Sequence, residues 1–496
     1  MTSPFNVANV NINKILIKTS FCWTITYAET KIRYHQLILE VHMKKSSPVL
    51  NRFFEKSPIS VIARGMIERL LNPAQLDRWF SKISKTQYTR DLLFSTIFDI
   101  MSQVVLGSRK SVNAAFMASK GEINVSITSV YNKLSGIETN TSAELVRYAA
   151  KEATPIIEAL GPRKPLLPGF RIKILDGNCI EAVEHRIKEL RSISSGALPG
   201  KSLVVFDPAL RMPIDVFPCE DGHAQERSLL SQVLPTVETD DIVISDRNFC
   251  VRSFILGIAA KNAFSITRLH SQLPYEILGK EKRAGKTETG KVTEQRIEVV
   301  NELGEKKPFR LIRVYLKKKT RDGDTHIAII TDLPKAFASA SLVAELYRNR
   351  WKIETSFQEL EKFWNSEINS LGYPPAALFG FCVALVAQII LAVVKAALSS
   401  AHGNDIVDNK LSGYYLADEI SGTYRGMQVA IEDEEWKIFQ KSSQAEVIMI
   451  LKQLASNVKI ASFLKSPRGP KKPVTKRKSD PKHPHVSIAK ILAKRS

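Results

Sequence analysis

Two aspartates stand where carboxylates could act together in one site. Asp176 follows the apolar, β-branched run 171–175 and precedes Gly177, and Asp246 follows the similar run 241–245. Each run predicts a buried strand that ends in turn residues. Functional groups gather at the carboxyl ends of strands in an open sheet, so we expect both aspartates to project into one cleft. Either aspartate alone is more often a turn former or a helix cap.

A third acid lies in a stretch with helical spacing. Tyr347, Arg350 and Glu354 are three and four residues apart, which predicts that they share one face of a helix. Gln358 and Glu361 continue the same stripe. A carboxylate, a guanidinium and a phenol on one face suit the binding of a phosphate backbone beside a metal ion. The alternative for this stretch alone is a solvated helix with mixed charges.

Three carboxylates are the ligands that phosphoryl transfer with a pair of divalent cations requires. Mg²⁺ prefers oxygen ligands and retains several waters, so a few carboxylates and substrate phosphates complete its coordination. Two such ions ~3.5–4 Å apart stabilise both the attacking and the leaving oxygen of an in-line displacement. We therefore expect Asp176, Asp246 and Glu354 to form one metal site.

The combined motif resembles the signature of a known family. Asp176-Gly177, Asp246-Arg247 and the helix with Tyr347, Arg350 and Glu354 look like those of bacterial insertion-sequence transposases of the DDE type. The resemblance is to the group marked by a Tyr-Arg-Glu-Lys helix, and it extends from about residue 165 to about residue 400. One position departs from that group. Glu361 stands where its lysine usually falls, and Lys362 follows, turned roughly 100° around the helix.

The resemblance implies a transposase that binds the ends of an insertion sequence, cleaves DNA with metal ions and transfers strands. The implied catalytic residues, which also bind two Mg²⁺ or Mn²⁺ ions, are Asp176, Asp246 and Glu354. The implied DNA contacts are Tyr347, Arg350, Lys362 and Arg247. The implied partners are double-stranded DNA of the terminal repeats and of the target, and a second copy of the chain in a DNA-bound homodimer. The expected location is the bacterial cytoplasm, in association with the nucleoid.

The composition agrees with a polyanionic partner. Lys and Arg total 71 against 50 Asp and Glu, which gives a formal net charge of +21. A basic chain of this kind binds nucleic acid by releasing counterions, although a membrane surface would attract it too. The five cysteines are scattered without paired spacing, which argues against a disulfide framework and a structural zinc site.

We expect an α/β fold with an RNase H-like catalytic core and a β-rich insertion, preceded by a helical DNA-binding domain. The order of predicted elements after residue 165 supports this core: three strands, a helix, a strand, a helix and a strand. The expected regions are an irregular extension at 1–47, in which Met43 is an alternative start; a helical DNA-binding domain at 48–162, with 126–134 as a candidate recognition helix; the catalytic domain at 163–400 with its insertion at about 270–325; a helical region at 401–463; and a basic disordered tail at 464–496.

The segment 376–394 is apolar except for Gln388 and is long enough to span a bilayer. It follows the glutamate helix directly and starts after Pro374-Pro375. We therefore expect a buried core helix and no membrane partner, with a transmembrane helix as the alternative.

Two other functions remain open at this stage. One is an RNase H-like nuclease that cuts DNA without joining it, because such an enzyme uses the same metal site. The other is a catalytically decayed transposase that acts as a DNA-binding repressor.

Overall fold

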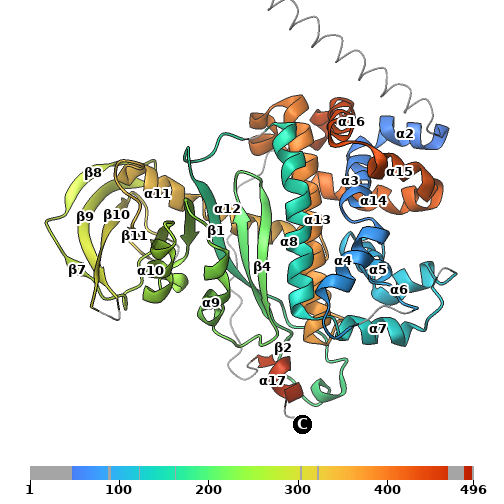
Figure 1. The fold of residues 1–496 in the computed structure, drawn as a ribbon, viewed down its shortest axis with the longest axis horizontal. Helices are drawn as coiled ribbons and strands as arrows, with labels where there is room; N and C mark the ends of the chain where they lie inside the picture. The colour runs from blue at the N-terminus through green and yellow to red at the C-terminus, as the bar shows by residue number, and fades with distance from the viewer. Residues whose placement is uncertain are drawn as a thin grey trace, which may run out of the picture.

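The structure is a computed structural model that describes residues 47–87, 91–121, 123–161, 163–301, 304–320, 323–466 and 485–493. The irregular extension predicted at 1–47 lies outside the described residues except for Ser47, and so does the basic segment 467–484. A β-rich lobe, a central group of strands and a block of helices follow one another along the longest axis (Figure 1).

One mixed sheet forms the framework of the molecule. Its strands run in the order β4-β3-β1-β5-β6-β11-β10-β9-β7, and β8 pairs with β9. The strands are β1 (Arg171–Cys179), β3 (Lys201–Asp207), β4 (Met212–Cys219), β5 (Asp241–Ser245), β6 (Phe264–Arg268), β7 (Glu276–Ile277), β8 (Lys282–Lys286), β9 (Gly290–Val300), β10 (Lys306–Leu316) and β11 (His326–Thr331). β1, β5 and β6 are parallel, whereas β3 is antiparallel to β1 and β4. The prediction of an α/β fold is confirmed, and the structure shows that most of its strands form one large mixed sheet.

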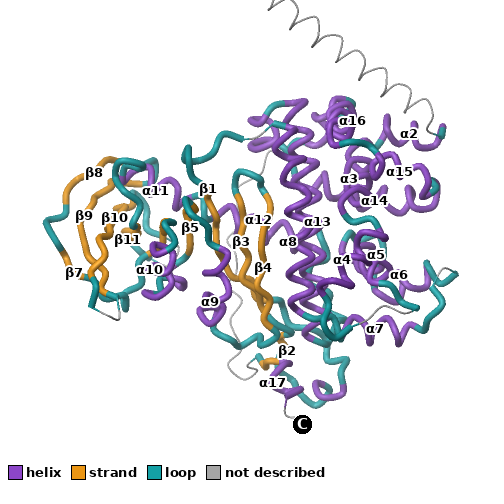
Figure 2. Tube along the Cα trace, viewed as in Figure 1, coloured by secondary structure: helices purple, strands orange, loops and turns teal. Residues whose placement is uncertain are grey.

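Alternation along β1 divides its side chains between the two faces of the sheet. Ile172 and Ile174 belong to the large core that includes α8 (Thr139–Leu160) and α13 (Pro374–His402). Leu175 belongs to a separate core with α9 (Leu230–Val233) and α10 (Arg252–Ala260). Figure 2 shows the central strands between these two groups of helices. Because successive side chains of a strand point to opposite faces, Asp176 faces the same side as Ile174.

The predicted β-rich insertion is present as strands β7 to β10, and it continues the central sheet. β11 pairs antiparallel with β6, and β10 then pairs with β11 and β9. Residues of β9, β10 and β11, including Ile297, Leu311 and Ile330, form a separate small apolar core together with Ile255 of α10.

Helices from both ends of the sequence share one core beside the sheet. Before β1 lie α2 (Pro48–Lys56), α3 (Pro58–Leu70), α4 (Pro73–Ile83), α5 (Phe94–Val105), α6 (Val112–Ala118), α7 (Ile127–Ser135) and α8. After α13 lie α14 (Gly413–Ala430), α15 (Asp433–Lys441) and α16 (Gln444–Ser456). The helix predicted at 126–134 corresponds to α7, which Ser126 caps by accepting a hydrogen bond from the Ser129 backbone N–H at 3.2 Å.

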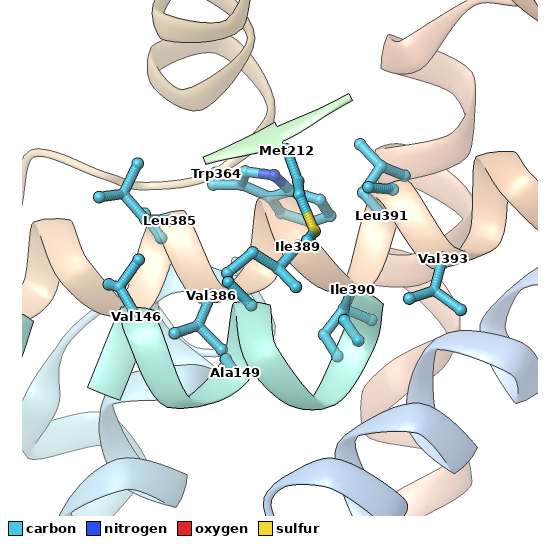
Figure 3. Packing of buried hydrophobic residues seen from close by; sticks show 14 of the residues in the cluster. Val146, Ala149, Met212, Trp364, Leu385, Val386, Ile389, Ile390, Leu391 and Val393 are labelled. Carbon is cyan, nitrogen blue, oxygen red and sulfur yellow. The ribbon is translucent and has the colours of Figure 1, made fainter. Parts of the chain in front are cut away.

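The apolar segment 376–394 lies within α13, which packs against α8, α5, α3 and α16. Among the described residues α13 is the one helix with the length and apolar composition to cross a membrane, and 94% of its most apolar 18-residue window is buried. Figure 3 shows Leu385, Val386 and Ile389 of this helix against Val146 and Ala149 of α8. This burial agrees with the predicted core helix.

The end of the chain departs from the predicted disordered tail. Val486–Ser487 (β12) pairs with Ala197–Leu198 (β2), and the short helix Ile488–Leu492 (α17) follows. Ile488 is fully buried in a small cluster with Leu190. The prediction of disorder to residue 496 is therefore wrong for 486–492, because these apolar residues find partners around residues 183–197.

Gln388, the polar residue within α13, provides a test of this core. It accepts a hydrogen bond from the Trp364 indole N–H at 3.2 Å and donates to Glu359 at 3.1 Å. We expect Gln388→Leu to lower the unfolding free energy by about 1–3 kcal/mol, because it leaves a buried indole N–H without an acceptor. Urea denaturation measures this change. Gln453→Leu, at an exposed position of α16, is the control, and equal effects of the two substitutions would contradict the prediction.

Candidate active site

The register of the sheet sets Asp176 beside Asp246. β1 and β5 are parallel, and Leu175 pairs with Ser245, so the next residue of each strand stands at the same level. Neighbouring strands are ~4.8 Å apart. Ile174 and Ile244 share the core on the α13 side, so the two aspartates project to that same side. This register is compatible with the prediction that both aspartates project into one cleft.

β1 does not end at Asp176 as predicted, but continues to Cys179. Residues 176–179 stay paired with β3, from Asp176 opposite Val204 to Cys179 opposite Lys201. Gly177 therefore stands within a strand instead of a turn. Its missing side chain leaves room for Glu226, because a Cβ at Gly177 would lie only 2.2 Å from the Glu226 Oε1 atom.

Two helices, instead of the single predicted one, carry the third acid. α11 (Ala340–Arg348) ends at Tyr347-Arg348, and α12 (Trp351–Phe363) begins after Arg350. At the junction the backbone N–H groups of Arg350 and Ile353 bond to carbonyls three residues earlier, as in a tighter 3₁₀ turn. The prediction of one continuous helix face is wrong at this point. The tighter turn changes the direction in which Tyr347 points relative to Glu354.

Arg350 connects two of the acids directly. Its Nη1 lies 2.9 Å from Asp176 Oδ2, and its Nη2 lies 2.6 Å from Glu354 Oε1. The Arg350 side chain is only 10% exposed. The Tyr347 hydroxyl donates to Asp246 Oδ1 at 3.4 Å and its ring lies beside the Arg350 guanidinium. Arg350 and Tyr347 thus link the three predicted acids, and these five predicted site residues lie in one cluster.

Burial and neighbouring charges shift the protonation of this cluster. Burial raises the pKa of Asp176 to about 6, since the opposing effect of Arg350 is partly cancelled by repulsion from Glu354 and Asp246. Burial works to lower the pKa of Arg350, but Tyr347 and the three carboxylates raise it above its usual value. Burial also raises the pKa of the Tyr347 phenol, which therefore stays protonated. The site thus combines a permanent cation, Arg350, with one acid, Asp176, whose charged form is disfavoured by burial.

The carboxylate oxygens of the site suit a divalent cation, but in this structure two of the three carboxylates pair with Arg350 instead. Three carboxylates supply the hard oxygen atoms that Mg²⁺ prefers. Within the described part of the chain, however, no three acidic, histidine or cysteine side chains are grouped closely enough to hold a metal ion. The Arg350 guanidinium occupies the space between Asp176 and Glu354. Chelation by all three acids therefore requires Arg350 to release at least one of them.

Two further polar side chains border the site and were not predicted from the sequence. Glu226 lies over Gly177 and accepts a hydrogen bond from the Asn248 side-chain amide at 2.6 Å. Asn248 is two residues past Asp246 and also accepts from Arg227 Nε at 3.2 Å. A sequence signal for Glu226 was a glycine directly after an acid inside a β-branched run, which indicates close approach of another group.

The two remaining predicted DNA contacts lie outside this cluster. Arg247 is exposed in the short helical turn that follows Asp246. Lys362 is exposed near the end of α12, about 12 Å from Glu354 along the helix axis. Neither position tests a contact with DNA, so both remain predictions.

The raised pKa of Asp176 predicts how stability changes with pH. Folded Asp176 holds its proton up to about pH 6, whereas the unfolded carboxyl loses it near 3.8. Its contribution to stability is therefore present below the unfolded pKa and is lost as pH rises through the folded pKa.

We expect the stability of Asp176→Asn relative to the unsubstituted chain to rise between about pH 4 and about pH 6, by up to about 3 kcal/mol, and to stay constant above that range. Chemical denaturation in the presence of a chelator measures the difference. Asp91→Asn, at an exposed position, is the control. A stability difference for Asp176→Asn that does not change with pH would contradict the assignment.

Comparison with known proteins bears on the segment that contains the cluster. No curated protein matches the chain. A solved structure with some likeness is the cryo-EM structure of a piggyBac transposase synaptic complex with hairpin DNA, at 9% identity and a TM-score of 0.36, covering 77% of this chain and 84% of that one. A likeness at that level supports no conclusion about the fold. Residues 168–385 match the family described as "Transposase DDE domain". The stretch that carries Asp176, Asp246 and Glu354 thus matches the transposase DDE domain family, as the resemblance of its motifs predicted.

Proposed function

We propose that the chain is a transposase that binds the ends of an insertion sequence, cleaves DNA and transfers the cut strand to a target. The observation that carries the proposal is the convergence of Asp176, Asp246 and Glu354 on one side of the sheet, linked by Arg350 and Tyr347. This cluster lies inside the stretch that matches the transposase DDE domain. The motif further suggests the group with a Tyr-Arg-Glu-Lys helix and an origin in a bacterial insertion sequence.

An RNase H-like core is the fold that we infer for the catalytic part. The strand order β4-β3-β1-β5-β6, with β3 antiparallel and β5 and β6 parallel to β1, supports this inference. In that arrangement the first acid stands on the central strand and the second follows its parallel neighbour, as Asp176 and Asp246 do.

Asp176, Asp246 and Glu354 are the residues that would hold two Mg²⁺ ions, or Mn²⁺. When bound, such ions activate the attacking oxygen and stabilise the leaving oxygen of a phosphodiester. The residues of the chain contribute the remaining functions. Arg350 pairs with carboxylates in the free protein and has a buried Nε without a hydrogen-bond partner, so it is suited to bind a phosphate beside the cut. The protonated Tyr347 hydroxyl can donate to the same phosphate.

The proposed DNA partner includes both the terminal repeats and the target. Arg247 and Lys362 are exposed cations that we assign to backbone contacts. Helix α7, within the helical region before β1, is the element that we assign to reading the element end. Bringing two ends together makes a DNA-bound homodimer the expected assembly, and the net charge of +21 supports association with the bacterial nucleoid.

Glu354→Gln tests the proposed chemistry. We expect this variant to lose Mg²⁺-dependent cleavage of an element-end duplex by at least about 100-fold, while DNA affinity changes little, because one metal-binding carboxylate is removed. Gel analysis of end-labelled DNA measures cleavage, and anisotropy measures binding. Glu361→Gln is a matched control, because Glu361 is an exposed acid on the same helix. Normal cleavage by Glu354→Gln would refute the assignment.

A second assay separates the transposase from the two alternatives. Incubation of pre-cut element ends with supercoiled plasmid shows joined products for a transposase. A nuclease without strand transfer gives cut DNA only, and a decayed repressor binds DNA but gives neither product.

A further inference from the structure

A second cluster of charges lies beyond the proposed active site. Arg163 follows α8, Arg211 stands in the turn between β3 and β4, and Asp408 lies in the π-helical turn Ile406–Lys410 after α13. The Nη2 atoms of both arginines contact the same oxygen of Asp408, its Oδ1. Segments distant in sequence thus bring two guanidinium groups to one carboxylate.

Positive charge exceeds negative charge in this cluster. Lys352 of α12 adds a third positive charge near Arg163 and Arg211. Burial lowers the pKa of Arg163 to about 10. Burial and the nearby Arg163 lower that of Arg211 to about 9. Three cations therefore repel one another around one acid, and an additional negative charge would relieve this repulsion.

Arg211 also has hydrogen-bonding capacity that its neighbours do not fill. Its Nη1 donates to Ser399 Oγ at 3.1 Å and its Nη2 to Asn404 Oδ1 at 3.3 Å. Its Nε is buried without a partner. The backbone of Arg211 has a φ of 61°, a conformation that residues other than glycine rarely adopt. The surrounding structure thus holds the Arg211 backbone in a strained conformation and leaves its guanidinium incompletely paired.

A phosphate offers more acceptor oxygens than the single carboxylate oxygen that the arginines share. Guanidinium groups bind phosphate through paired, charge-assisted hydrogen bonds. The cluster borders a narrow hollow whose lining includes the polar residues Arg163, Arg211, Ser399 and Asn404, beside apolar residues such as Leu210. Lys352 is exposed and only two residues before Glu354, so the cluster and the acids are joined by one turn of α12.

We propose that Arg163, Arg211 and Lys352 form a binding site for a DNA backbone phosphate, which Asp408 occupies in the free protein. The proposal rests on the proposed function, since DNA that reaches Glu354 passes close to Lys352. On binding, a phosphate takes the place of the Asp408 carboxylate between the two guanidinium groups. Asp408 thus limits the affinity for DNA until a phosphate displaces it.

Binding of a random-sequence duplex in chelator, followed by anisotropy over a range of salt, tests the site without cleavage. We expect Arg211→Gln and Arg163→Gln each to weaken binding about tenfold and to reduce the slope of log K against log salt by about one. Lys352→Gln should act in the same direction. Asp408→Asn should strengthen binding about threefold to tenfold, because it removes the competing carboxylate.

The ion pair of Lys437 and Glu434 on α15 supplies charge-matched controls. Lys437→Gln and Glu434→Gln change the net charge by the same amounts, away from the cluster. Effects equal to those of the cluster variants would show that net charge alone acts, and would overturn the proposal. Weaker binding by Asp408→Asn, with a lower unfolding free energy, would mean that Asp408 is only a structural clamp.

Inorganic phosphate distinguishes a DNA site from a site for the free ion. We expect inorganic phosphate to displace DNA only weakly from the Asp408→Asn variant, because DNA also contacts cations outside this site. Stabilisation of Asp408→Asn by inorganic phosphate without any change in DNA binding would overturn the proposal. This test does not depend on catalysis. If the chain lacks the proposed strand transfer, the binding differences among these variants are still expected. If the binding differences are absent, the dependence of cleavage on Glu354 can still be tested separately.

Discussion

The contact of Arg350 with Asp176 and Glu354 is the polar interaction on which the arrangement of the candidate site depends. Asp176 belongs to β1 and Glu354 to α12, two elements that pack against each other, and the Arg350 side chain pairs with both acids. A largely buried guanidinium between them neutralises two carboxylates that would otherwise repel each other. Removing Arg350 would leave the Asp176 and Glu354 carboxylates without a balancing charge. The loss of stability would then exceed the net contribution of the ion pairs, because a buried charge without a partner is costly. The orientation of Glu354 towards the two aspartates therefore depends on this one arginine.

The acids could be found from sequence because each lies in a locally regular pattern. Asp176 and Asp246 follow β-branched runs that form parallel neighbours, and period-two alternation then decides which face they share. The break between α11 and α12 could not be found in the same way. Tyr347, Arg350 and Glu354 satisfy helical spacing with or without a tighter turn at Asn349-Arg350. Glu226 was missed for another reason: Gly177 indicates that some group approaches the strand closely, but the sequence does not say which residue occupies the space that its absent side chain leaves.

The burial of α13 shows how tertiary packing decides between a core helix and a transmembrane helix when composition allows both. The length and hydropathy of α13 fit a bilayer as well as a core. Its surroundings in the fold, helices from both ends of the sequence, cover it on nearly all sides. Gln388 can then remain in this apolar helix because Trp364 and Glu359 satisfy its amide. The apolar end of the chain follows the same logic, since Ile488 is buried only because residues near 190 offer it a cluster.

Acidic side chains in this very basic chain have a shared role at the Arg350 cluster and at the cluster of Arg163 and Arg211. Arg350 is held by Asp176 and Glu354, and Arg163 and Arg211 are held by Asp408. A bare guanidinium, partly buried, would be costly in the free protein, whereas a paired one keeps its position at lower cost. Each pairing also leaves an Nε of an arginine without a partner, at Arg350 and at Arg211. The carboxylates thus hold the arginines in place while leaving hydrogen-bonding capacity that a phosphate group can complete. The exchange of a carboxylate for a phosphate replaces one anion by another at the same guanidinium groups. It therefore requires no rearrangement of the fold, only a ligand that offers more oxygen atoms than the carboxylate it displaces.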